Sequence, residues 1–268
     1  MIENSFCFFT LGDITNKEKM LVESLLPLFN IDYYNINSII NEYDKKNPLL
    51  LLEKIINNGI ENIIIDIKTG FDYNDESAKD LVKEILNISK KYNISVTCFI
   101  TSLNLSLGTS FGTDLEKIEI SKLLNESEYS LLLKLSVKIT SFIAYKSNNL
   151  SLEDNQSKIV NYLKNQDRTS STDSISSNRM FSIKSPQTGF VKNINVFEID
   201  DLLNKLGRDD ARVGIVFTKQ IGDYVLENEE LAKVYLNEKD ILASEVLDCF
   251  EIATEMGKVD SLIKEIVG

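Results

Sequence analysis

Two short apolar stretches, each rich in β-branched residues, lie on either side of a segment with helical periodicity. Residues Glu61–Lys68 and Ile94–Thr101 have the length and composition of buried strands. Between them, Glu76–Tyr92 places leucine and isoleucine on one side of a helix and lysines on the other, and Asn74 or Asp75 can cap its first turn. Two strands joined by a helix of this length pair in parallel. The chain is therefore predicted to contain a βαβ unit and to belong to the α/β class.

The stretch Asn104–Ile120 connects the second of these strands to another helix, and it contains two closely placed glycines, Gly108 and Gly112. Either Thr113 or Asp114 can cap that helix. A glycine-containing loop between a strand and a helix exposes backbone amides and carbonyls, so it can hold an ion or simply make a tight turn. The residues alone leave both functions open.

The composition is that of an ordinary globular protein, with 43% apolar and 26% charged residues among 268. No apolar run approaches the roughly 20 residues that cross a bilayer, and the N-terminal residues lack a basic region and a cleavage site. We therefore expect a cytoplasmic protein that does not bind a membrane. The formal net charge of −12, without a basic stripe, argues against nucleic acid as a partner.

The chain contains no histidine and only three cysteines. The absence of histidine excludes Ser-His-Asp and Cys-His catalytic arrangements within this chain, and it also excludes metal sites built on imidazole. Any chemistry therefore depends on carboxylates, lysines, hydroxyls or a partner's residues. Cys7, Cys98 and Cys249 are widely spaced and lie among apolar neighbours, so they are expected to be reduced core residues.

Local patterns divide the chain into four parts. Residues 1–58 are predicted to form a helical segment, and residues 59–165 an α/β core. Residues 166–180 are a Ser/Thr-rich linker, and residues 181–268 a C-terminal α+β domain.

Within the first and last parts, caps and periodicity predict individual elements. Two helices are expected between Lys17 and Tyr43, and another over Leu49–Asn58, ended by Gly59. In the C-terminal part, a long last helix capped by Asn237 or Asp240 is expected to run through Ile252.

Three stretches in the same order resemble one enzyme family. Leu107-Gly108, Gly112, Leu115-Glu116 and Glu119 keep the spacing of a signature in which a Pro-Leu-Gly turn precedes Gly-Asn-Ala-Leu-Glu and a second glutamate. Ile63–Gly70 (IIIDIKTG) is similar to the strand and turn LVLDVKVGSG, and Ser185–Asp240 contains a Val-Gly-Ile-Val strand and a Gly-Asp-x-Val hairpin. The family is that of thymidine and pyrimidine-nucleoside phosphorylases. The resemblance implies a nucleoside phosphorylase/phosphoribosyltransferase-like α/β domain followed by the family's C-terminal α+β domain.

The resemblance also implies which residues hold the pyrimidine. Lys54 matches the lysine that contacts the base, whereas Leu50 stands where the family has a serine. Gly12 stands where the family has an arginine that contacts the pyrimidine carbonyl, so a charge-assisted contact is lost. From the residues alone, a lysine near a helix end such as Lys54 is usually solvated and complements the helix dipole.

Bacterial members of the family bind a potassium ion, and the matching positions here are Leu107, Ser110 and Glu119. Two backbone carbonyls and a carboxylate are hard oxygen ligands that suit a weakly held alkali cation. A structural function of Glu119, in a salt bridge or as a cap, is the alternative.

The family's phosphate-binding Lys/Ser/Gly loop and its histidine precede the part matched here, and this chain contains neither. We therefore expect a divergent, N-terminally reduced relative that has no phosphorolytic activity alone and acts in binding, regulation or assembly. A pyrimidine nucleoside or base is the implied ligand. The alternative is one subunit of a split phosphorylase, which a partner chain with the missing phosphate-binding half would complete. Its partner is then that chain, or a second copy of this one.

Overall fold

The computed structural model describes ten stretches of the chain, which fall into two compact units. The described residues are 6–11, 17–31, 47–70, 72–103, 107–126, 130–148, 150–165, 177, 179–257 and 260–268. Unit 1 comprises Met1–Leu103, Leu133–Tyr162 and Ser261–Gly268. Unit 2 comprises Asn104–Leu132 and Leu163–Asp260. These boundaries differ from the four contiguous parts expected from the sequence, because each unit is assembled from separate segments.

Unit 1 is built on a four-stranded sheet with the order β1-β2-β3-β11. Its strands are β1 (Phe6–Leu11), β2 (Asn62–Thr69), β3 (Ser95–Ser102) and β11 (Ile263–Val267). The first three strands are parallel, and β11 pairs antiparallel with β3. The parallel pairing of β2 and β3 confirms the predicted βαβ unit and the α/β class.

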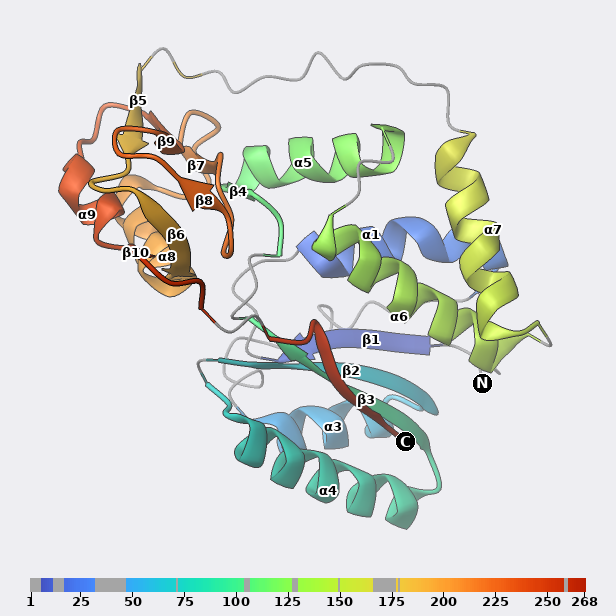
Figure 1. Ribbon diagram of the computed structural model, residues 1–268. Coiled ribbons are helices and arrows are strands. Elements are labelled where there is room, and N and C mark those ends of the chain that lie inside the picture. Colours follow the sequence, from blue (N-terminus) through green and yellow to red (C-terminus); the bar gives the residue numbers. More distant parts are fainter. Residues whose placement is uncertain are drawn as a thin grey trace. The chain divides into compact units, whose positions relative to one another are not determined.

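Helices cover both faces of this sheet (Figure 1). On one face, α3 (Pro48–Asn57) and α4 (Asp75–Tyr92) enclose the core with alternate residues of β1, β2 and β3. Over the other face lie α1 (Lys17–Leu25), continued by the 3-10 helix η1 (Leu26–Phe29), and α6 (Leu131–Ser147), which is followed by α7 (Leu152–Lys164). The ring of Phe99 in β3 meets that of Phe142 in α6 edge-on at 5.5 Å.

Local capping explains where α4 begins and ends. The Asn74 side chain accepts hydrogen bonds from the backbone amides of Glu76 and Ser77, and the Ser77 hydroxyl accepts from the Asn74 amide. This capping box confirms Asn74 as the cap. At the other end, Asn93 takes a left-handed conformation, which asparagine tolerates better than most residues.

Unit 2 contains two antiparallel sheets, with the orders β4-β7-β9-β5 and β10-β6-β8. The strands are β4 (Ser110–Phe111), β5 (Arg179–Lys184), β6 (Gly189–Ile194), β7 (Gly214–Phe217), β8 (Tyr224–Val225), β9 (Glu230–Leu236) and β10 (Phe250–Ala253). The helices are α5 (Thr113–Glu126), α8 (Val196–Leu206) and α9 (Ala243–Leu247). Unit 2 thus combines strands and helices, but it takes β4 and α5 from outside the C-terminal range 181–268, and β11 of that range belongs to unit 1.

Two sequence-based predictions are wrong. The N-terminal part is not wholly helical, because Phe6–Leu11 forms β1 and pairs with β2. The long last helix is absent from the described residues of this region: α9 ends at Leu247, and Phe250–Ala253 pairs with β6 as β10. The second helix expected before Tyr43 lies outside the described residues, as does most of the Ser/Thr-rich linker.

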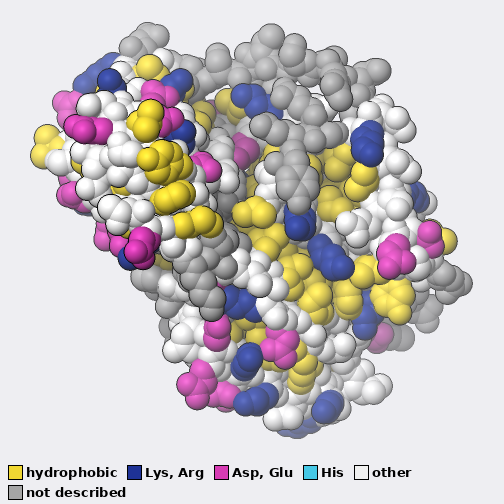
Figure 2. All heavy atoms as spheres, viewed as in Figure 1, with side chains coloured by type: hydrophobic (Ala, Val, Ile, Leu, Met, Phe, Trp, Pro, Cys, Tyr) yellow, Lys and Arg dark blue, Asp and Glu magenta, His cyan; other side chains and the backbone are white. Residues whose placement is uncertain are grey.

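The structure also tests what the composition predicted for the cysteines, for membrane-spanning helices and for surface charge. Cys7, Cys98 and Cys249 are free and buried, as expected. Across the described ranges, each helix is too short or too polar to cross a membrane. On the face shown in Figure 2, basic side chains are dispersed among acidic ones.

Candidate functional sites

The loop before α5 in unit 2 is held by the carboxylate of Glu119. One carboxylate oxygen, Oε1, accepts hydrogen bonds from the Thr109 backbone amide (2.6 Å) and hydroxyl (3.1 Å). The other, Oε2, accepts from the Ser110 amide at 3.2 Å. Glu119 is buried, so these donors offset the cost of removing its charge from water. Its structural function is therefore to cap the loop from within the following helix.

Backbone geometry decides which groups of this loop face Glu119. The Thr109 carbonyl accepts a hydrogen bond from the Phe217 amide of β7 at 2.8 Å. Because successive peptide groups of a strand point in opposite directions, the Ser110 amide and carbonyl both lie on the side away from β7, where Glu119 is. The Ser110 carbonyl and the Glu119 carboxylate therefore lie on one side of β4. Oxygen ligands of these two types are the kind that a hard cation prefers.

Just beyond this loop, two glycines allow the segment around Gly112 to pass close to the start of β7. A Cβ atom on Gly112 would lie 2.6 Å from the Val213 carbonyl oxygen, and one on Gly214 would lie 2.3 Å from Leu115 Cδ1. Gly112 also has φ +113°, which side chains rarely permit. Both glycines belong to motifs that carry the family resemblance. Close backbone approach gives the physical reason for these glycines.

The first turn of α5 is tied to the end of α8. Arg208, which follows α8, pairs with Glu116 of α5 and with Asp200 of α8. The Gly112 amide donates to Glu116 Oε1 at 3.3 Å, so one carboxylate serves both contacts. These contacts fix the direction in which α5 leaves the glycine loop.

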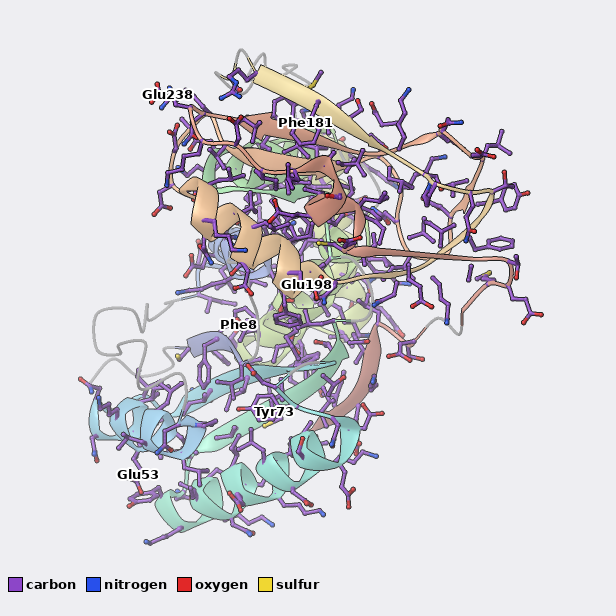
Figure 3. All side chains as sticks on the ribbon, turned by 90° about the vertical axis from the view of Figure 1, so that its left-hand side faces the viewer. Phe8, Glu53, Tyr73, Phe181, Glu198 and Glu238 are labelled. Atoms are coloured by element: carbon purple, nitrogen blue, oxygen red, sulfur yellow. The ribbon has the colours of Figure 1, made fainter. Side chains whose placement is uncertain are left out.

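In unit 1, a buried polar network lies on the sheet face opposite α3 and α4. Lys68 Nζ of β2 donates to Asp66 Oδ2 at 2.5 Å and to the carboxylate of Glu18 in α1. The Thr101 hydroxyl of β3 donates to Asp66 Oδ1 at 2.8 Å. All four side chains are at most 1% exposed. Phe8 of β1, labelled in Figure 3, points to the same face of the sheet.

This network lies in the carboxyl-terminal half of the parallel strands, the end at which α/β proteins usually bind ligands. Two carboxylates hold the Lys68 ammonium, so its charge is already matched inside the protein. Beyond it, the Gly70 amide donates to the Tyr73 carbonyl at 2.9 Å and closes the turn that leaves β2. Partial burial and the nearby Asp72 raise the pKa of the Tyr73 hydroxyl.

A comparison with characterised proteins supports the resemblance. The pyrimidine-nucleoside phosphorylase of Bacillus subtilis (strain 168) is 26% identical to this chain over 250 residues. The likeness is distant. It covers 81% of this chain and 57% of that enzyme, so the chain spans little more than half the length of the relative it matches. No family model matches the chain.

The residues predicted from the sequence fall into two groups. Ser110 and Glu119 come together within unit 2, with Leu107 at the start of the same loop. Lys54 belongs to unit 1, in the last turn of α3, where it is half-buried. Glu53, the residue before it, points away from the sheet (Figure 3). Gly12 lies outside the described residues.

The predictions from the sequence did not include the buried network around Lys68 or the ion pairs of Arg208 with Glu116 and Asp200. A signal for the first was present, since Asp66 and Lys68 are charged residues at alternate positions of an otherwise apolar strand. Alternation places both on one face, where they need partners once that face is buried.

Proposed function

We propose that this protein is a pyrimidine-nucleoside phosphorylase-like protein that binds a pyrimidine nucleoside or base but does not cleave nucleosides with phosphate on its own. The distant likeness to the Bacillus enzyme supports the family and the ligand class. The observation that carries the loss of activity is the replacement of two of the three matched pyrimidine-holding residues. Gly12 and Leu50 stand where the family has arginine and serine, and only Lys54 is retained.

The surroundings of α3 support this proposal. Leu51, Leu52 and Ile55 face the core, whereas Leu50 and Lys54 are half-buried and one turn apart. A leucine side chain has no donor or acceptor for a pyrimidine carbonyl or imide. Phosphorolysis depends on electrostatic stabilisation of both phosphate and the leaving base, which one lysine does not supply.

Binding and cleavage can be tested separately on the purified chain. Thymidine and uridine are expected to bind in calorimetric titrations, while no free base is released when phosphate is added. Lys54→Met is expected to weaken binding by about tenfold, the cost of one charge-assisted hydrogen bond. Lys83→Met is the matched control, because Lys83 is an exposed α4 lysine paired only with Asp80 among the described residues. Turnover by the chain alone, or equal binding by both variants, would contradict the proposal.

A second candidate is that a partner chain completes a split phosphorylase. The observation favouring it is that the match covers only 57% of the Bacillus enzyme. The family resemblance implies that the missing portion includes the phosphate-binding loop. In this case, adding a polypeptide that carries the phosphate-binding part of that enzyme produces base release which neither chain gives alone. Absence of turnover in the mixture, despite complex formation, would eliminate this candidate.

We further propose that Leu107, Ser110 and Glu119 hold a potassium ion. When bound, the ion would neutralise the buried carboxylate of Glu119. Potassium is expected to raise the melting temperature of unit 2 more than sodium does at equal ionic strength. Glu119→Gln should remove this difference, whereas Glu153→Gln on the exposed first turn of α7 should keep it. If potassium and sodium act alike on the unaltered protein, this site does not bind potassium selectively.

A further inference from the structure

The edge of the unit 1 sheet is covered by a strand that returns from a distant part of the sequence. β11 pairs antiparallel with β3, and its register breaks between Ile263 and Glu265. The sheet continues on the other side of β3, but β11 has no further neighbour within the described strands. β11 is therefore held by one ladder only.

Burial within β11 is low compared with the strand that it covers. All five residues of β11 are half-buried or exposed, and Ile266 is 39% exposed. In β3, by contrast, only the first residue is exposed. Burial of apolar surface is the main stabilising term in folding. Because β11 buries less apolar surface than β1, β2 or β3, it is stabilised less than those strands.

Besides its ladder with β3 and the packing of Val267 against the core, two kinds of contact hold β11 in place. Lys264 Nζ pairs with Asp75 in the first turn of α4 at 2.6 Å, and Glu265 lies 3.6 Å from Lys79. Gly268 packs flat on β3, because a Cβ atom there would lie 2.2 Å from the Val96 carbonyl oxygen. Partly exposed ion pairs contribute little. The attachment is specific in register but weak.

From these contacts we propose that β11 is a detachable cover of the β3 edge, which leaves and returns while the rest of unit 1 stays folded. Its release exposes a strand edge that is otherwise protected, and exposed edges pair with other strands. The opening also uncovers one side of Cys98, the register partner of Val267. Local openings of this kind need far less free energy than global unfolding.

Cys98 reports on this motion. In the closed state it is fully buried, and burial raises the pKa of its thiol to about 12. Cys7 lies in β1, in the same core cluster but not beside β11. A thiol reagent that reaches Cys98 through β11 opening therefore labels Cys98 without labelling Cys7, whereas unfolding of unit 1 exposes both of these thiols.

The test compares alkylation rates of individual cysteines by mass spectrometry. Lys264→Glu combined with Gly268→Ala removes the ion pair and forces a Cβ against β3, so we expect Cys98 labelling to accelerate by about tenfold with Cys7 unchanged. Lys83→Glu, which breaks an exposed pair elsewhere on α4, is the matched control and should leave both rates unchanged. Equal acceleration at Cys7 and Cys98, or none at Cys98, would overturn the proposal.

A second variant tests the closed state. Val267→Cys places a thiol opposite Cys98, at a cross-strand separation that a disulfide can bridge. Oxidation by oxidised glutathione joins the two sulfurs with loss of two electrons and two protons to the reagent. The cross-link should slow hydrogen exchange at β11 amides and leave α4 amides unaffected. If β11 amides of the unlinked protein exchange as slowly as those of β2, the strand is not detachable.

Discussion

Replacing Lys68 with methionine is expected to destabilise unit 1 by about 3–5 kcal/mol, the cost of removing one partner from a buried ion pair. Two carboxylates, those of Asp66 and Glu18, would remain buried without the ammonium that now binds both. The cost is large because both carboxylates are buried. Neither can be hydrated again unless α1 moves or the sheet opens.

Urea unfolding followed by circular dichroism measures this effect. Adding Asp66→Asn and Glu18→Gln to Lys68→Met removes the stranded charges and should restore much of the lost stability. Lys83→Met is the control, since exposed pairs are worth about 0–1 kcal/mol. A loss below about 1 kcal/mol for Lys68→Met, or no recovery in the triple variant, would show that the network does not hold α1 to the sheet.

Gly112→Ala is expected to destabilise unit 2 by about 2–4 kcal/mol, from backbone strain and overpacking together. Its φ is +113°, and the added Cβ would meet the Val213 carbonyl oxygen at 2.6 Å and Gly214 Cα at 2.9 Å. Both neighbours are backbone atoms, which cannot rotate away as a side chain would. The crossing between the glycine loop and β7 would have to open.

Gly59→Ala separates strain from steric contact. Gly59 has φ +77°, yet a Cβ there would meet nothing within 4 Å. The cost at Gly59 is therefore only that of a left-handed alanine, about 1–2 kcal/mol. Thermal unfolding of the two variants should differ clearly. Equal losses would mean that the close approach at Gly112 relaxes freely.

Much of the fold follows from local sequence signals. α4 is fixed by its Asn74 cap and its periodic apolar face, and β2 and β3 by their β-branched composition. The errors lie where pairing at long range overrides local preference. Residues Phe250–Ala253 are compatible with a helix, and only their pairing with β6 makes them a strand.

The candidate sites divide in the same way. Thr109 and Glu119 are only ten positions apart, and the family resemblance indicates that residues of this loop meet. Glu18 and Lys68 are 50 positions apart, and no local pattern connects them. Asp66 and Lys68 could be recognised as unusual in an apolar strand, but their third partner depends on how α1 packs.

The chain passes between its two units four times, at Leu103, Leu132, Tyr162 and Asp260. A cut in the Ser/Thr-rich region would therefore not yield two autonomous halves. The first fragment would lack its β11, and the second would lack β4 and α5. Dissection of this protein for fragment complementation, or fusion of a reporter between its units, must keep all three pieces of unit 1 on one polypeptide or supply them together.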